Sequence, residues 1–64
     1  MIEVTRLKGK KIVINAELIE SLEETPDTVI TLTSGKKYVV NESANDIVDL
    51  VLEYKKKTTG FVIK

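Results

Sequence analysis

The stretch TVITLTSGKKYVV, residues 28–40, decides the fold of this chain. A β-branched run precedes the Ser-Gly pair and a second apolar run follows it, which is typical of two strands joined by a tight turn. Alternation along both runs places four apolar side chains on one face: Ile30, Leu32, Tyr38 and Val40. The stretch therefore predicts an antiparallel hairpin with one buried face.

The pair Gly35-Lys36 also raises the question of a nucleotide site, because a phosphate-binding loop ends in Gly-Lys. Such a loop needs an earlier glycine, a Ser or Thr after the lysine, and a helix whose N-terminal amides hold the phosphates. Here Ile30 stands at the earlier glycine position, Lys37 follows the lysine, and a strand pattern comes next. We therefore interpret Gly35 as a turn residue.

The N-terminal residues predict a second hairpin. IEVTRL at 2–7 alternates as a strand, KGK at 8–10 supplies a glycine for a tight turn, and KIVIN at 11–15 forms the returning strand. The residues expected to face the core are Ile2, Val4, Ile12 and Ile14.

Residues 16–24 fit two structures. Their apolar positions form a helical stripe that Asn15 could cap, and they also form an imperfectly alternating strand. We favour a short turn at 16–18 and a strand at 19–24, because TPDT at 25–28 is typical of a β-turn before an extended run. The choice between helix and strand stays open at this point.

The clearest element is a C-terminal helix that follows Ser43 and ends near residue 58. Ser43 and Asp46 resemble a capping box. Helical spacing gathers one apolar face from Ile47, Leu50, Val51 and Tyr54. Val48 and Leu52 lie off this face, so the helix is apolar on more than one side.

Together these elements predict an α+β fold in which one C-terminal amphipathic helix packs on an antiparallel sheet of four or five strands. A sheet curled into a small barrel is the alternative form. We expect a single domain at residues 1–58 and a short apolar tail at residues 59–64, whose conformation the pattern leaves open.

The length and composition of the chain argue against nucleic-acid binding and against a membrane span. The chain has 64 residues, ten basic and ten acidic side chains, and no Cys or His. A chain this short buries only about 60% of its unfolded surface, so a homo-oligomer is an expected route to stability. Zero net charge argues against general nucleic-acid binding, and no apolar run approaches the roughly 20 residues of a membrane span. We expect a cytoplasmic protein.

The residues provide no set suited to catalysis or to binding a cofactor. Without Cys and His, the candidates are Ser/Lys pairs, carboxylate pairs or a metal with oxygen ligands. The densest carboxylate group lacks the spacing and glycine of a calcium loop, and we interpret it as a solvated strand face. It consists of Glu17, Glu20, Glu23, Glu24 and Asp27. We predict no enzymatic activity, metal or cofactor.

Two basic groups are candidates for contact with a charged partner. The first surrounds the first turn and consists of Arg6, Lys8, Lys10 and Lys11. The second is Lys55-Lys56-Lys57, which precedes the apolar Phe61. The second group fits peripheral contact with an anionic membrane surface, and it also fits a helix end matched to the helix dipole.

Three parts of the chain carry a resemblance to a known family: IEVTRLKGK at 2–10, INAELIESLEETPDTVITLTSGKKYVV at 14–40, and Glu42-Ser43 before the helix. With these strings, the chain resembles the FlbD/SwrD family of small flagellar motility proteins. The resemblance implies a cytoplasmic accessory protein at the flagellar motor base that is not an enzyme. It also implies that the protein promotes motor torque through the MotA/MotB stator. The family supplies no catalytic residues to carry over.

Surface chemistry selects the residues expected to contact a partner. They are Lys55, Lys56, Lys57, Phe61, Val48 and Leu52. Two rival functions remain. One is a nucleic-acid-binding regulator of flagellar gene expression, which needs an exposed basic and aromatic surface. The other is a structural homo-oligomer that uses Val48 and Leu52 as its interface.

Overall fold

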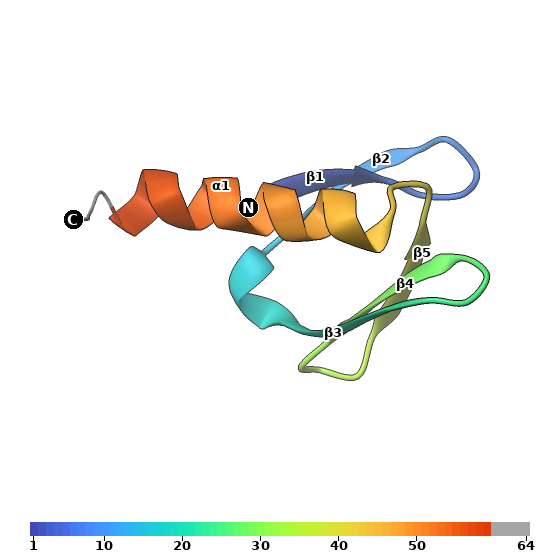
Figure 1. Cartoon of the computed structure of the whole chain (residues 1–64). Helices are drawn as coiled ribbons and strands as arrows, with labels where there is room; N and C mark the ends of the chain where they lie inside the picture. The colour runs from blue at the N-terminus through green and yellow to red at the C-terminus, as the bar shows by residue number, and fades with distance from the viewer. Residues whose placement is uncertain (60–64) are drawn as a thin grey trace.

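The computed structural model describes residues 1–59 of the chain, and side chains for residues 1–56 (Figure 1). The elements follow one another as β1 (Ile2–Thr5), β2 (Lys11–Ile14), the 3-10 helix η1 (Ala16–Leu18), β3 (Ile19–Glu24), β4 (Thr28–Leu32), β5 (Lys37–Val40) and α1 (Ala44–Thr59). This order confirms the predicted α+β class. Because α1 ends at Thr59, the predicted tail at residues 59–64 begins inside the helix, and residues 60–64 lie outside the described residues.

The strands form two antiparallel sheets instead of one. β1 pairs with β2, and the second sheet has the order β3-β4-β5. An isolated bridge between Arg6 and Val40 joins the ends of β1 and β5, and the Asn41 amide beside it donates to the Thr5 carbonyl at 2.8 Å. The single sheet of four or five strands is therefore not confirmed, because pairing between β1 and β5 is limited to this junction. The alternative of a closed barrel is wrong, since β2 and β3 do not pair with each other.

Two glycines form the tight turns that the sequence predicted. Gly9 has φ 92° and Gly35 has φ 93°, a backbone conformation that residues with a Cβ atom rarely adopt. The Gly35 amide donates to the Leu32 carbonyl at 2.9 Å, and β5 begins at Lys37. The Gly35-Lys36 pair thus lies in a hairpin and not at the start of a phosphate-binding helix.

Residues 16–24 adopt the structure that we favoured from the sequence. A single 3-10 turn occupies Ala16–Leu18, and the side chain of Asn15 accepts a hydrogen bond from the Glu17 amide at 3.0 Å. β3 then follows, with a register shift against β4 between Ile19 and Ser21. This bulge explains the imperfect alternation of the segment, because an extra residue interrupts the period of two.

The core lies between the sheets and α1. α1 packs against β1 and β3, and in Figure 1 it runs between these two strands. The buried apolar residues are Ile2, Val4, Ile14, Ala16, Ile30, Leu32, Val40 and Ile47. Every inward-facing strand residue predicted from the two hairpins is buried or packed against this cluster, as are the four residues of the predicted helix face.

Candidate partner-binding groove

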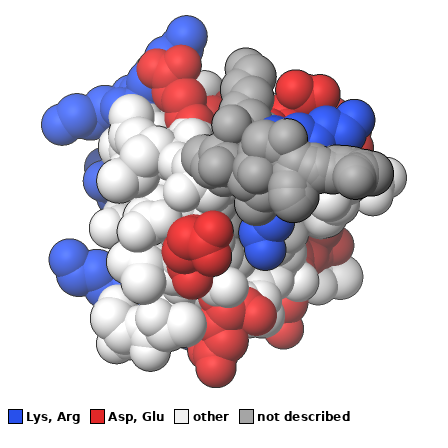
Figure 2. Space-filling view, turned by 90° about the vertical axis from the view of Figure 1, so that its left-hand side faces the viewer, with Lys and Arg blue, Asp and Glu red and all other residues white. Residues whose placement is uncertain are grey.

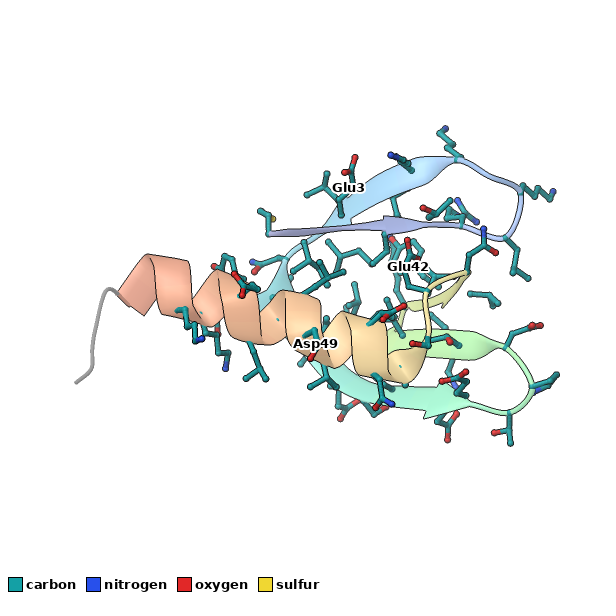
Figure 3. The ribbon with its side chains drawn as sticks, turned by 45° about the horizontal axis from the view of Figure 1, so that its top comes forward. Glu3, Glu42 and Asp49 are labelled. Carbon is teal, nitrogen blue, oxygen red and sulfur yellow. The ribbon has the colours of Figure 1, made fainter. Side chains whose placement is uncertain are left out.

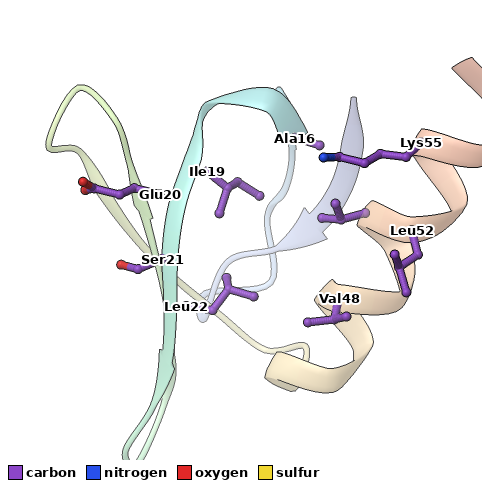
Figure 4. Close-up of a pocket in the computed structure, with 9 residues that line it drawn as sticks. Ala16, Ile19, Glu20, Ser21, Leu22, Val48, Leu52 and Lys55 are labelled. Carbon is purple, nitrogen blue, oxygen red and sulfur yellow. The ribbon is translucent and has the colours of Figure 1, made fainter. Parts of the chain in front are cut away.

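A groove opens between α1 and β3 at the surface (Figure 4). Its volume is about 360 Å³, at the lower end of the about 300–1,000 Å³ typical of ligand sites. The lining is mainly apolar and consists of Ala16, Ile19, Glu20, Ser21, Leu22, Val48, Val51, Leu52 and Lys55. A hollow with these dimensions and this lining is suited to a few apolar side chains.

The helix wall of the groove carries two exposed apolar side chains. Val48 is 45% exposed and Leu52 is 55% exposed, whereas Ile47 on the packed face of α1 is fully buried. Since α1 has 3.6 residues per turn, Val48 and Leu52 lie one turn apart on the same side, rotated away from Ile47. Lys55 lines the groove a further turn along. The sequence predicted this second apolar side of the helix.

The strand wall is made by the inner face of β3. Ile19 and Leu22 are half-buried and point toward the helix, whereas Glu20 and Ser21 point away (Figure 4). The bulge between Ile19 and Ser21 produces this arrangement, because it allows two consecutive residues to face outward. Sequence reasoning missed this wall. The available signal was the pair Ile19 and Leu22, whose spacing of three breaks the alternation of a regular strand and so indicates a bulge if the segment is extended.

Charged side chains flank the groove on both walls. Glu20 on β3 is exposed and Lys55 on α1 is exposed. Lys56 lines a neighbouring hollow together with Asp49, Leu52 and Glu53. Viewed from the end where α1 finishes, the described residues show an uncharged area with acidic side chains at its centre and below it and basic side chains along one edge (Figure 2). The apolar floor supplies contact area and the charged rim supplies orientation.

One acidic residue of β3 holds the helix wall in place. The Ala44 amide at the start of α1 donates to Glu24 Oε1 at 2.8 Å, and the Asp46 amide donates to Ser43 Oγ at 3.1 Å. Both contacts satisfy amides that have no partner within the helix. The Ser43 cap was predicted. Glu24 is exposed on β3, as the predicted solvated strand face requires, and its additional contact with the amide of Ala44, twenty residues away along the chain, was not predicted.

A second carboxylate joins the segment before α1 to β1. The Thr5 amide donates to Glu42 Oε1 at 2.9 Å and to Oε2 at 3.0 Å. Burial raises the pKa of Glu42, but the backbone amides of Thr5 and Glu42, the Thr5 side chain and the charge of Lys11 together hold this pKa below its ordinary value. Figure 3 shows Glu42 between Glu3 on β1 and Asp49 on α1. Glu42 is thus a structural tie between the two sheets and the helix.

The first basic group has a packing role at one position. The guanidinium of Arg6 lies 5.9 Å from the centre of the Tyr38 ring, within the range of a cation–π contact. Lys8, Lys10 and Lys11 are exposed around the first turn and the start of β2.

The predicted contact residues divide into two sets. Val48, Leu52 and Lys55 lie together in the groove, and Lys56 lies beside it. Lys57 is within α1, but its side chain is outside the described residues, as is Phe61. The structure therefore brings the helix residues together with Ile19 and Leu22, which are distant in the sequence.

Neither a cluster of metal ligands nor a membrane-spanning helix occurs in the described part of the chain. Within residues 1–59, no three acidic side chains are grouped so as to hold a metal ion. Across the same residues, no helix has the length and apolar character needed to span a membrane.

Fold and groove together define a small α+β domain with an open apolar groove between its helix and an edge strand. Residues 1–59 match the family model described as flagellar and swarming motility proteins, FlbD, and the chain belongs to this family. This confirms the resemblance seen in the sequence and implies a role in flagellar or swarming motility. Comparisons with curated proteins and with solved structures gave no significant match.

Proposed function

We propose that this protein is a non-enzymatic accessory protein of the flagellar motor, which promotes torque by binding the MotA/MotB stator or an adjacent motor-base protein through the groove between α1 and β3. The proposal places the protein on the cytoplasmic side of the motor. Membership of the motility family supports the biological setting. The exposed Val48 and Leu52 on the groove wall are the observation that carries a binding role.

The size of the groove limits the affinity that it can provide. Covering Val48 and Leu52 contributes at most about 1.5–3 kcal/mol for each side chain. A micromolar complex needs about 8 kcal/mol. We therefore expect a weak and reversible contact, with Lys55 and Lys56 adding charge contacts at the rim. A reversible contact suits a protein that modulates a working motor and is not a permanent part of it.

The test is the torque of tethered cells that lack the native homologue, measured with and without this protein while flagella are counted. Two groove variants, Val48→Gln and Leu52→Gln, are expected to fold normally and to restore torque less well than the unchanged chain. The matched control is Leu7→Gln, because Leu7 is exposed to a similar degree, 51%, and lies outside the groove.

The result has three distinguishable forms. Restored torque at an unchanged number of flagella, lost in the groove variants only, supports the proposal. Equal loss in the Leu7 variant removes the groove from the mechanism. A change in the number of flagella without a change in torque per motor contradicts the stator role and favours control of gene expression or assembly.

A further inference from the structure

The two outermost strands of the fold carry opposite charges on unpaired edges. β2 pairs with β1 on one side only and β3 pairs with β4 on one side only, so within the described residues each presents a free backbone edge. In Figure 1 these two strands lie on opposite sides of the domain. An unpaired strand edge is a template for pairing with another strand.

The edge of β3 is acidic on its outer face. Glu20 and Glu23 are exposed there, and Ser21 lies between them. Because the bulge interrupts β3 after Ile19, the regular part of the strand runs from residue 21 to residue 24. On the inner face, Leu22 is half-buried beside the groove.

The edge of β2 has the complementary pattern. Its four residues, Lys11–Ile14, equal the regular part of β3 in length. Exposed lysines at positions 8, 10 and 11 precede or begin the strand, and Val13 is exposed on the same face as Lys11. On the inner face, Ile12 is half-buried. Lys11 is also attracted to Glu42 of its own chain, so Lys8 and Lys10 are the lysines more available to a partner.

We propose that β2 of one copy of this chain pairs with β3 of a second copy, which extends the sheet from molecule to molecule. Side chains on neighbouring strands stand next to each other on both faces. Lys11 of β2 then stands beside the outer face of β3 that carries Glu20 and Glu23, and Ile12 stands beside Leu22 on the inner face. Lys8 and Lys10, in the turn before β2, add positive charge at the same end of the strand. Pairing uses the backbone edge of β3 and leaves the helix wall of the groove with Val48 and Leu52 open.

Pairing of two identical edges, β2 with β2 or β3 with β3, is unfavourable. Two β3 edges bring glutamates together and two β2 edges bring lysines together, and like charges on opposing strands are destabilising. The contact is therefore head-to-tail, with β2 of each copy bound to β3 of the next. Repetition of such a contact gives a closed ring if the last copy meets the first, and an open filament if it does not. Pairing of charged side chains at an exposed edge is weakened by salt. Assembly at low salt that decreases as salt is raised is the expected behaviour.

The experiment measures the mass of the intact chain by light scattering on a size-exclusion column, from micromolar to millimolar concentration. We expect species larger than the 7.2 kDa chain. The acidic-edge variant Glu20→Lys with Glu23→Lys, and the basic-edge variant Lys8→Glu with Lys10→Glu, are each expected to weaken association about tenfold or more. A mixture of the two variants is expected to associate again, because every contact between unlike variants joins opposite charges. Glu53→Lys on α1 is the control of equal charge change per site, and it is expected to associate like the original chain.

Several outcomes overturn the proposal. A chain that stays monomeric at millimolar concentration has no such edge contact. Association that survives both edge variants, or that the mixture fails to restore, excludes the pairing of β2 with β3. Association lost on Leu52→Gln but not in the edge variants places the interface in the groove instead.

Amide hydrogen exchange provides a measurement that requires no variant. If β2 and β3 pair between copies, amides on their free edges exchange more slowly as concentration rises, while amides of β1 and β4 change little. Protection confined to α1 contradicts edge pairing. The result is independent of motor torque, so the edge contact can stand or fall separately from the proposed function.

Discussion

Both carboxylate oxygens of Glu42 accept a hydrogen bond from the backbone amide of Thr5, which lies thirty-seven positions earlier in the sequence. The distances from the Thr5 nitrogen to Oε1 and Oε2 are 2.9 and 3.0 Å. This contact connects the end of β1 to the segment that leads into α1. It lies at the junction of the two sheets, next to the bridge between Arg6 and Val40. The Glu42 carboxylate thus connects β1 to the segment before α1, beside the bridge that joins the two sheets.

The lowered pKa of Glu42 predicts how its contribution to stability depends on pH. Because the pKa of Glu42 is lower in the folded state, this side chain stabilises the fold at pH values above its ordinary pKa of 4.5 and loses this effect as the pH falls through the folded pKa. We expect Glu42→Gln to lower the melting temperature at pH 7, with the difference from the original chain vanishing in strong acid. Thermal denaturation followed by circular dichroism between neutral and acidic pH tests this. Parallel curves at all pH values would contradict it, and Glu17→Gln, at an exposed position of η1, is the control.

Removal of the Glu24 side chain should weaken the start of α1. Glu24→Ala leaves the Ala44 amide without its acceptor, and we expect a cost of about 1 kcal/mol in the free energy of unfolding, similar to the loss of a helix cap. Ser43→Ala should cost a similar amount, because Ser43 serves a different amide, that of Asp46. Urea denaturation measures both. Glu17→Ala, at another exposed glutamate, should change stability by less than about 0.5 kcal/mol, and an equal loss there would remove the capping explanation.

Truncation of two residues of the same helix should lower stability to very different degrees. Ile47 is fully buried, so Ile47→Ala should cost about 2–5 kcal/mol, enough to unfold much of so small a domain. Leu52 is 55% exposed, so Leu52→Ala should cost less than about 0.5 kcal/mol. The measurement is urea denaturation of both variants at low protein concentration. A large loss for Leu52→Ala would mean that this side chain is covered in solution.

The turn at Gly35 should be sensitive to a single methyl group. No heavy atom lies within 4 Å of the place that a Cβ atom would take, so the cost of Gly35→Ala comes from the φ of 93° and not from a clash. We expect a loss of about 1–2 kcal/mol in the free energy of unfolding. Gly35→Asn should cost less, because Asn tolerates positive φ better than Ala. If Ser34→Ala proves as harmful as Gly35→Ala, the explanation from backbone conformation fails.

The elements of this fold were predictable because each has a local cause. Alternation marked the inward residues of the hairpins, such as Val4 and Ile30, and helical spacing marked the buried face around Ile47. The glycines at positions 9 and 35 marked the turns. For the candidate site, the exposed Val48 and Leu52 could be found from the sequence because they lie off the apolar face of their own helix.

The remaining features depend on residues that are distant along the chain. The strand wall of the groove, made by Ile19 and Leu22, exists only because α1 packs across β3. Glu24 could not be told from its acidic neighbours, because its role depends on the position of the Ala44 amide. The division into two sheets was equally hidden, since it depends on how far β1 and β5 pair beyond the bridge at Arg6.

The sequence by itself determined the two hairpins with their turns, the C-terminal helix and the inward faces of these elements, because these follow from side-chain periodicity and backbone preference over a few residues. Only the tertiary structure decided how the elements meet: two sheets joined at one bridge, a helix held by Glu24 and Glu42, and a groove and two free edges left at the surface. The physical reason is that hydrogen bonds and apolar contacts between distant segments depend on their relative placement in space, which no local pattern encodes.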